Sequence, residues 1–396
     1  MTKGTVKGVI ANMVLMVTVN EFWSVDGIPH WMHHADATED MMGLSDIVFP
    51  LFLFVMGMSI PYAIDSKMEK CPARDVVAHI LSRSVALLLM GAFICNAEYG
   101  ISEASGYTST LYNIVMLAGF FLVWNRYPHN LSQWLVRGLK TLGVIALVFL
   151  MITSRNAEGN TFSAHWWGIL GLIGWTYLVC AMLYFLFREK KGLLTAILIF
   201  FLAINVLVNQ MNPAHDGHVL LTIGGADFLR TMLDILHMGN CGLCALCMGG
   251  VVLSVLTRPF VGHTGRRQTI SLLGFAAVLF LAFLVSHEYF IISKIIATVP
   301  WVLAIMSLAV VLYLVMSLLV EHHYDKWFCV IKPAGTATLT CYMMPYLLYS
   351  LTDITGFIYP DILLHFPIGL AKCLCFAFVC VGLTYLLGKC RIMLRI

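Results

Sequence analysis

Three histidines lie among several carboxylates near the start of the chain, at His30, His33 and His34. Histidine is the side chain best suited to accept a proton from an amine or a hydroxyl near neutral pH, and it can also attack a thioester. A single loop histidine is usually only solvated, but three at the edge of an apolar segment indicate a site. The stretch predicts acid–base or nucleophilic chemistry at one of these imidazoles.

Asp46 directly precedes the apolar run that starts at Ile47. A carboxylate at a helix N-terminus is stabilised by the free backbone N–H groups there, so Asp46 can be read as a helix cap. It can also be read as the group that orients a histidine and stabilises the imidazolium. The two readings are compatible. Asn20, at the end of the preceding apolar run, is either a polar helix terminus or a donor to a developing oxyanion.

A second set of candidates is expected on the same side of the membrane as the histidines. Paired tryptophans at an interface are usually belt residues, but beside His165 they could also line a sugar site. Lys294 is a candidate partner for an anionic group. The full set of predicted substrate-binding residues is His165, Trp166, Trp167, Lys294 and Trp301.

The opposite side offers candidates for an anionic ligand that enters from the cytoplasm. Arg83 lies within an apolar run, where a buried arginine needs a partner. Lys332, Gly335 and Thr336 are expected at the start of a helix, a position that favours phosphate, although close helix packing explains the small residues equally well. The cysteines at 241, 244 and 247 are interpreted as small packing residues, and no metal site is predicted.

Composition places the chain in a membrane. Of its 396 residues, 60% are hydrophobic and 11% are charged, whereas a soluble domain carries roughly 25% charged residues. We therefore expect an all-α, polytopic integral membrane protein that forms one domain over residues 1–396, in contact with the lipid bilayer and with no nucleic-acid partner.

Apolar runs of about 20 residues between polar breaks predict the spanning helices. Twelve such runs occur, at residues 5–20, 46–64, 77–95, 108–124, 136–153, 165–187, 192–208, 237–257, 269–287, 297–320, 335–352 and 366–388. Ten spans would fit as well if two of the runs were re-entrant or interfacial. A further short interfacial helix is expected at 229–236.

The placement of basic residues tests this count. With the N-terminus in the cytoplasm, nineteen of the 24 lysines and arginines fall in cytoplasmic segments, and three (Arg155, Arg230 and Lys294) fall on the other side. Arg83 and Lys372 lie within helices. This split follows the positive-inside rule and predicts two cytoplasmic termini, with the histidines outside. The inner membrane of a bacterium is the expected location.

Several motifs resemble those of the heparan-α-glucosaminide N-acetyltransferase family. They are Trp31-Met32-His33-His34-Ala35, Asp46-Ile47-Val48-Phe49-Pro50, His165-Trp166-Trp167-Gly168, Ser293-Lys294-Ile295 with Trp301, and Pro333-Ala334-Gly335. The resemblance covers most of the chain. It is greatest to bacterial members, some of which are labelled as N-acetylglucosamine-related transporters.

The resemblance implies a function and ranks the histidines. Such enzymes move an acetyl group from cytoplasmic acetyl-CoA across the membrane to the amine of a glucosamine at the end of a glycan. The position that matches their catalytic histidine is His34, while Asn20 and Asp46 match an asparagine and an aspartate nearby. A homodimer is also implied.

One segment departs from the family pattern. Members usually begin with Arg-x-x-Ser-x-Asp-x-x-Arg-Gly, whereas this chain reads Lys3-Gly4-Thr5-Val6-Lys7-Gly8. An inactive homologue is therefore one alternative to an acetyltransferase. An amino-sugar transporter, which would use the same outer aromatic residues without acetyl transfer, is the other.

Overall fold

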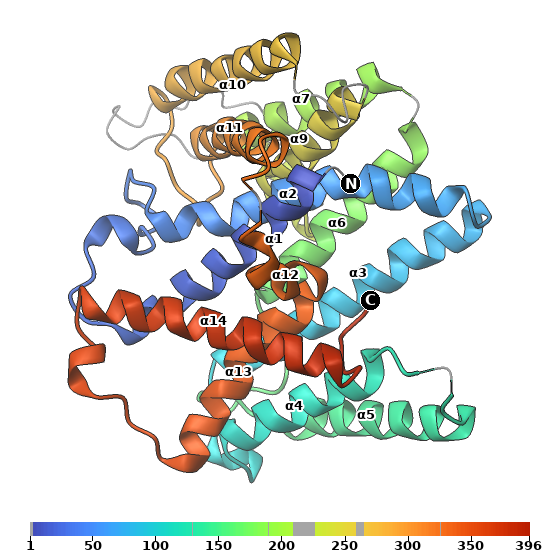
Figure 1. Ribbon diagram of the computed structural model, residues 1–396, viewed down its shortest axis with the longest axis vertical. Coiled ribbons are helices and arrows are strands. Elements are labelled where there is room, and N and C mark those ends of the chain that lie inside the picture. The colour runs from blue at the N-terminus through green and yellow to red at the C-terminus, as the bar shows by residue number, and fades with distance from the viewer. Residues whose placement is uncertain (1–2, 129, 189, 209–225, 259–264, 325) are drawn as a thin grey trace. The chain divides into compact units, whose positions relative to one another are not determined.

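The computed structural model describes residues 3–128, 130–188, 190–208, 226–258, 265–324 and 326–396. The regular structure in these ranges is helical, without a β-strand. The long helices that precede residue 209 are α1 (Lys3–Asn20), α2 (Leu44–Met68), α3 (Ala73–Glu98), α4 (Ser109–Trp124), α5 (Gln133–Thr153), α6 (Gly168–Phe187) and α7 (Lys191–Val208). They are followed by α8 (Ala226–Ile235), α9 (Gly242–Thr257), α10 (Arg266–His287), α11 (Val299–Glu321), α12 (Phe328–Thr336), α13 (Thr338–Thr355) and α14 (Ile368–Lys389), as Figure 1 shows.

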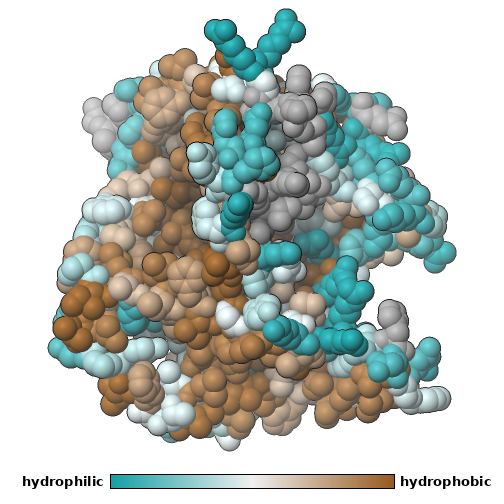
Figure 2. All heavy atoms as spheres, in the orientation of Figure 1, coloured by the Kyte–Doolittle hydropathy of each residue, from teal (hydrophilic) through white to brown (hydrophobic). Residues whose placement is uncertain are grey.

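Eight of the described helices are long and apolar enough to cross a membrane: α2, α3, α5, α6, α7, α10, α11 and α14. The helices α4 and α9 are also apolar but shorter. Hydrophobic residues cover much of the face seen in Figure 2, as a surface in contact with lipid requires. The protein is therefore an integral membrane protein with several spans.

Every predicted apolar run coincides with a helix, and the interfacial helix expected at 229–236 corresponds to α8. The remainder of the outer loop predicted at 209–236 lies outside the described residues. The boundaries differ at two places that matter for the candidate sites. The helix expected from residue 165 begins at Gly168, and the one expected from residue 335 is divided into α12 and α13, with Ala337 in a non-helical conformation between them.

The described chain forms two compact units, and each is assembled from three separate stretches of sequence. The first unit contains residues 1–12, 28–81 and 175–329, and the second contains residues 13–27, 82–174 and 330–396. In the first unit, α2 packs against α9 at very short range. A Cβ atom on Gly57 would collide with the carbonyl of Cys247, and one on Gly250 would collide with the carbonyl of Phe54. The absence of side chains at these glycines is what permits the close approach.

Candidate functional site

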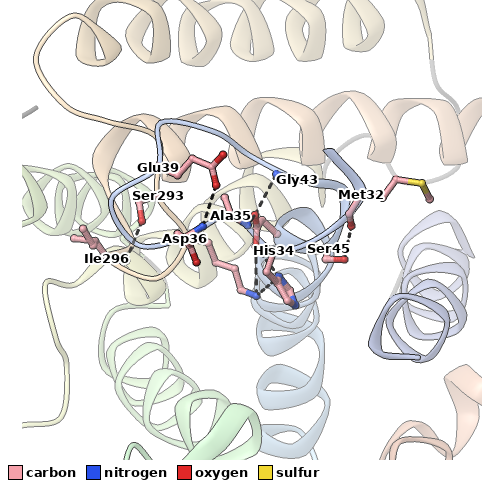
Figure 3. A network of polar contacts seen from close by, with 11 residues as sticks. Met32, His34, Ala35, Asp36, Glu39, Gly43, Ser45, Ser293 and Ile296 are labelled. Atoms are coloured by element: carbon pink, nitrogen blue, oxygen red, sulfur yellow. Dashed lines mark hydrogen bonds and ion pairs between the residues drawn. The ribbon is translucent and has the colours of Figure 1, made fainter. Parts of the chain in front are cut away.

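The candidate site lies in the first unit, where the loop of residues 30–43 (the histidine loop) returns to the start of α2. His30–Met32 forms a short 3-10 helix, and the chain then extends to Gly43, the N-cap residue of α2. The hydroxyl of Ser45 donates to the carbonyl of Met32 at 2.7 Å, which ties the loop to the first turn of α2. Figure 3 shows this loop folded over the helix start, with His34 and Gly43 converging on one carboxylate.

That carboxylate is Asp46, whose side chain is 1% exposed. Its Oδ2 atom accepts the backbone N–H groups of Gly43 at 3.1 Å and Ala35 at 3.0 Å. Its Oδ1 atom lies 2.7 Å from Nδ1 of His34 and 3.6 Å from Nζ of Lys294. Asp46 therefore caps α2 through one oxygen and contacts the histidine and the lysine through the other.

The contacts of His34 define its tautomer. Nδ1 of His34 lies 2.7 Å from Asp46 and 3.0 Å from Nζ of Lys294. A single ring nitrogen cannot donate to one partner and accept from the other at the same time. The ionised carboxylate can only accept, and its contact is the shorter, so Nδ1 carries the proton and donates it to Asp46. Lys294 therefore forms an ion pair with Asp46 and does not donate a hydrogen bond to Nδ1 of His34.

This assignment leaves the other ring nitrogen of His34 available for chemistry. The His34 side chain is 52% exposed. Within the described ranges, its Nε2 atom has no hydrogen-bond partner. With the proton on Nδ1, Nε2 presents a lone pair, which can take a proton from a substrate or attack an electrophilic carbon.

Lys294 comes from a loop that is held by hydrogen bonds on both sides. The backbone N–H of Ser293 donates to Oγ1 of Thr298 at 3.0 Å, which closes the loop before α11. The side-chain amides of Asn205 and Asn240 donate to the carbonyl of Ala297 at 3.0 and 3.1 Å. Ala297 has a positive φ of 53°, a strained conformation for a non-glycine residue, and these bonds hold it there. The lysine is thus presented by a rigid support.

Asp40 joins the histidine loop to the lysine loop. Its Oδ1 atom accepts the backbone N–H of Ile292 at 2.7 Å, and its Oδ2 atom lies 3.0 Å from Nε2 of His287. A second carboxylate, Glu39, lies 2.5 Å from Nε2 of His30. Asp40 and Glu39 therefore hold the histidine loop in place through these contacts.

Three groups at the site, outside the membrane-spanning helices, have shifted pKa values. The hydrogen bond with Glu39 raises the pKa of His30, and the same contact lowers the pKa of Glu39. Burial lowers the pKa of Lys294, and the nearby Asp46 carboxylate opposes that shift. The Lys294 side chain is 22% exposed, so its ammonium is largely removed from water and depends on Asp46 for its charge partner.

One further predicted residue belongs to the first unit. Trp301, in the first turn of α11, is fully buried. Its ring offers no face to a sugar in this structure, which differs from the expected role. The sequence pattern placed Trp301 near the outer end of a span but could not distinguish a surface ring from a packed one.

Several predicted residues lie in the second unit. Asn20 is exposed at the end of α1, and Arg83 is half-buried in α3. His165 and Trp167 have positive φ values of 46° and 70°, and the His165 ring stacks on Tyr99 with 4.1 Å between ring centroids. Trp166 beside them is 43% exposed.

The expected phosphate-binding helix start is placed differently. Lys332, Gly335 and Thr336 lie in the last turns of α12, not at the beginning of a helix. Thr336 uses its hydroxyl to bond the carbonyl of Lys332 at 3.3 Å. The break at Ala337 shifts the next helix N-terminus to Thr338. The sequence did not reveal this break, because the small residues on either side of it are compatible with a continuous helix.

Sequence reasoning missed a buried charged cluster in the second unit. Glu21 and Lys372 form an ion pair at 3.1 Å with both side chains almost fully buried. Tyr349 donates to Oε2 of Glu21 at 2.6 Å, and Lys372 donates to Oγ of Ser24 at 2.5 Å. The available signal was a lysine inside an apolar helix, which needs an acidic partner.

Comparisons with known proteins give a family but no activity. Residues 4–231 match the family model DUF5009, which is described as a domain of unknown function. Because the match covers more than half of the chain, the protein belongs to the DUF5009 family. No curated protein matches the chain.

Proposed function

We propose that the protein is a transmembrane acetyltransferase with His34 as its catalytic residue. The donor is acetyl-CoA from the cytoplasm, and the acceptor is the amine of a glucosamine-type sugar on the outer side. The observation that carries the proposal is the His34 imidazole, held at Nδ1 by a buried carboxylate and open at Nε2. The motif resemblance supports the choice of substrates.

In the proposed reaction, Nε2 of His34 takes a proton from the acceptor amine as the nitrogen bonds to the carbonyl carbon of the thioester. The carbon–sulfur bond then breaks, and the departing thiolate receives the proton from the imidazolium. In a two-step variant, Nε2 itself bonds the carbonyl carbon of the thioester, and the carbon–sulfur bond breaks to release the coenzyme A thiolate. The acceptor amine then bonds the same carbon, the carbon–Nε2 bond breaks, and the proton lost by the amine goes to the thiolate. In both variants, Asp46 stabilises the positive charge that forms on the ring.

Other residues are assigned supporting roles in this proposal. Lys294 supplies positive charge beside the reacting ring, which favours a negatively charged intermediate. The motif resemblance assigns Asn20 the role of a hydrogen-bond donor to an oxyanion. His165, Trp166 and Trp167 form an acceptor site, while Arg83, Lys332, Gly335 and Thr336 bind acetyl-CoA. The proposal includes twelve spans, two cytoplasmic termini, a bacterial inner membrane and a homodimer.

The test compares three purified full-length proteins with acetyl-CoA and glucosamine, and measures N-acetylglucosamine by mass spectrometry. His34→Ala is expected to lower the rate by about 10²–10⁴-fold, the usual contribution of a general acid–base group. The matched control is His33→Ala, which removes the adjacent imidazole and is expected to retain the native rate. Thermal melting of each variant separates a chemical defect from misfolding.

Equal rates for the native protein and His34→Ala would remove His34 from the mechanism. A native protein that carries N-acetylglucosamine into proteoliposomes without coenzyme A, and makes no acetylated product, would favour the transporter alternative.

A further inference from the structure

Lys294 lies in the loop of residues 288–298 (the lysine loop), whose two halves are held in different ways. The half after Lys294 is held by two side-chain amides that bond the loop backbone. The half before Lys294 is bonded to the histidine loop, because the backbone N–H of Ile292 donates to Oδ1 of Asp40 at 2.7 Å. Within the described ranges, this bond and the contact between His34 and Lys294 are the polar contacts that join the two loops.

Asp40 bonds two points of the segment that leads to Lys294. Besides the N–H of Ile292, its carboxylate contacts Nε2 of His287, the last residue of α10, at 3.0 and 3.1 Å. The His287 ring stacks on Phe283 one turn earlier, with 5.8 Å between the ring centroids and 10° between the ring planes. The imidazole is therefore oriented by its own helix. One carboxylate thus fixes the loop backbone relative to a helix end.

The bond from Ile292 lies close in the chain to the proposed reacting groups. Ile292 precedes Lys294 by two residues, so at most about 7 Å of chain separates their Cα atoms. Nζ of Lys294 lies 3.0 Å from Nδ1 of His34 and 3.6 Å from Oδ1 of Asp46. A lysine ammonium on its flexible stem is strongly hydrated, so it moves into solvent when its backbone is not fixed. The Asp40 contact therefore keeps the lysine charge beside the ring.

Stability of the loop gives a competing explanation. The side chains of Asp40 and His287 are 39% and 36% exposed, and an exposed ion pair contributes little to the free energy of unfolding. A purely structural contact would lower the melting temperature, whatever residue stands at position 294. A contact that positions the lysine has no effect on the rate once Lys294 is removed. The two explanations are therefore separable.

We propose that Asp40 is a positioning residue that holds the Lys294 ammonium beside the His34 ring. It acts through the backbone of Ile292 and touches no substrate. The inference rests on the proposed acetyl transfer and adds to it a residue outside the reacting groups. In this role Asp40 supports the charge that Lys294 supplies during reaction and not the binding of the sugar. Its loss lowers kcat and leaves the KM for the acceptor unchanged.

The first experiment measures kcat and the KM for glucosamine with the purified full-length protein and acetyl-CoA. Asp40→Ala is expected to lower kcat by about tenfold, the effect of one lost hydrogen bond to a charged group, with KM unchanged. Asp40→Asn keeps a side-chain oxygen that accepts from Ile292 and is expected to lose less. The matched control is Asp36→Ala, which removes an exposed carboxylate of the same loop and is expected to retain the native rate.

A double-variant cycle tests whether Asp40 acts through Lys294. If it does, adding Asp40→Ala to Lys294→Met lowers kcat no further than Lys294→Met alone. A further tenfold loss in the double variant would overturn the proposal, because Asp40 would then act without the lysine. Melting curves of all the proteins separate these results from misfolding. Asp40→Ser, which also loses the contact but stays polar, repeats the cycle if Asp40→Ala fails to fold.

A second readout requires no acetyl transfer. An amine-reactive reagent labels Lys294, and peptide mass spectrometry follows the labelling rate relative to that of the exposed Lys389. Labelling of the native protein is expected to be slow, because the Lys294 side chain is 22% exposed and paired with Asp46. Asp40→Ala is expected to raise the rate several-fold.

The labelling result separates this inference from the proposed function. Unchanged labelling of Lys294 in Asp40→Ala overturns the positioning role, whether or not the native protein acetylates glucosamine. Faster labelling in a protein that makes no acetylated product supports the hold of Asp40 on Lys294 and removes the acetyl transfer.

Discussion

The molecule contains two carboxylate–lysine pairs that differ in what surrounds them. In the second unit, Glu21 and Lys372 are both almost fully buried, and Ser24 and Tyr349 complete their hydrogen bonding. In the first unit, Asp46 is equally buried, but its lysine is 22% exposed and a half-exposed histidine shares its oxygen. The Glu21–Lys372 pair is closed to solvent. In the open pair, Asp46–Lys294, the carboxylate also contacts His34, which a substrate can reach.

The difference shows what distinguishes a structural ion pair from a reactive one. Removing either partner of a closed, buried pair leaves an isolated charge in an apolar environment, which lowers the free energy of unfolding. In the open pair, Asp46 has backbone N–H partners from Ala35 and Gly43 that remain when the lysine is lost. We therefore expect changes at Lys294 to alter chemistry more than stability.

The largest expected effect is on the closed pair. Lys372→Met leaves Glu21 charged and without its cation, so the free energy of unfolding is expected to fall by about 3–5 kcal/mol. Thermal and denaturant unfolding in detergent measures this change. The control is Lys389→Met in the same helix, because Lys389 is exposed at its end. If both variants unfold alike, the Glu21–Lys372 pair is not a stabilising feature.

At the open pair, a substitution is expected to lower activity strongly and to change the free energy of unfolding less than Lys372→Met does. Lys294→Met removes the cation beside His34 and is expected to lower acetyl transfer by about a hundredfold, as for a lost oxyanion-stabilising group. The unfolding free energy is expected to fall by about 1–3 kcal/mol, the value of a lost contact to a charged group, because Asp46 keeps its backbone N–H partners. Rates and melting curves from the same preparations check both values. A stability loss as large as that of Lys372→Met would show that the two pairs are equivalent.

The smallest expected effect concerns the pH dependence of the histidine loop. The raised pKa of His30 means that its contact with Glu39 is present below the usual histidine range and is lost as pH rises through the raised value. The lowered pKa of Glu39 means that the contact is lost on the acid side only as pH falls through that lowered value. The His30–Glu39 contact is therefore present from mildly acidic pH to near neutrality.

Hydrogen exchange of the loop backbone, measured by mass spectrometry across pH, tests this window after correction for the intrinsic exchange rate. Protection is expected to decrease above neutral pH in the native protein, and His30→Gln is expected to remove that decrease. His33→Gln serves as the neighbouring control and keeps it. If the protection of the native protein does not change above neutral pH, the His30–Glu39 contact does not stabilise the loop.

The helices and the histidine stretch were predictable because both depend on residues close together in sequence. Apolar runs of spanning length form helices wherever the surroundings are lipid, so the segments were recognised from composition alone. Asp46 lies only twelve residues from His34, and its place at the start of an apolar run already indicated a cap that could also contact the loop. The choice of His34 over its neighbours came from motif resemblance.

Only the tertiary structure decided which distant groups meet. Lys294 reaches His34 across 260 residues of sequence, and Arg258 reaches Asp65 across 193. Hydrophobicity defines which segments are helices, but it does not encode which helix ends adjoin, since lipid-facing and packed apolar residues look alike in sequence. For the same reason the sequence did not reveal that Trp301, a predicted substrate-binding residue of the outer side, is buried. The sequence by itself determined the helices and the reactive residue types, while packing between helices decided which charges are closed off and which remain open.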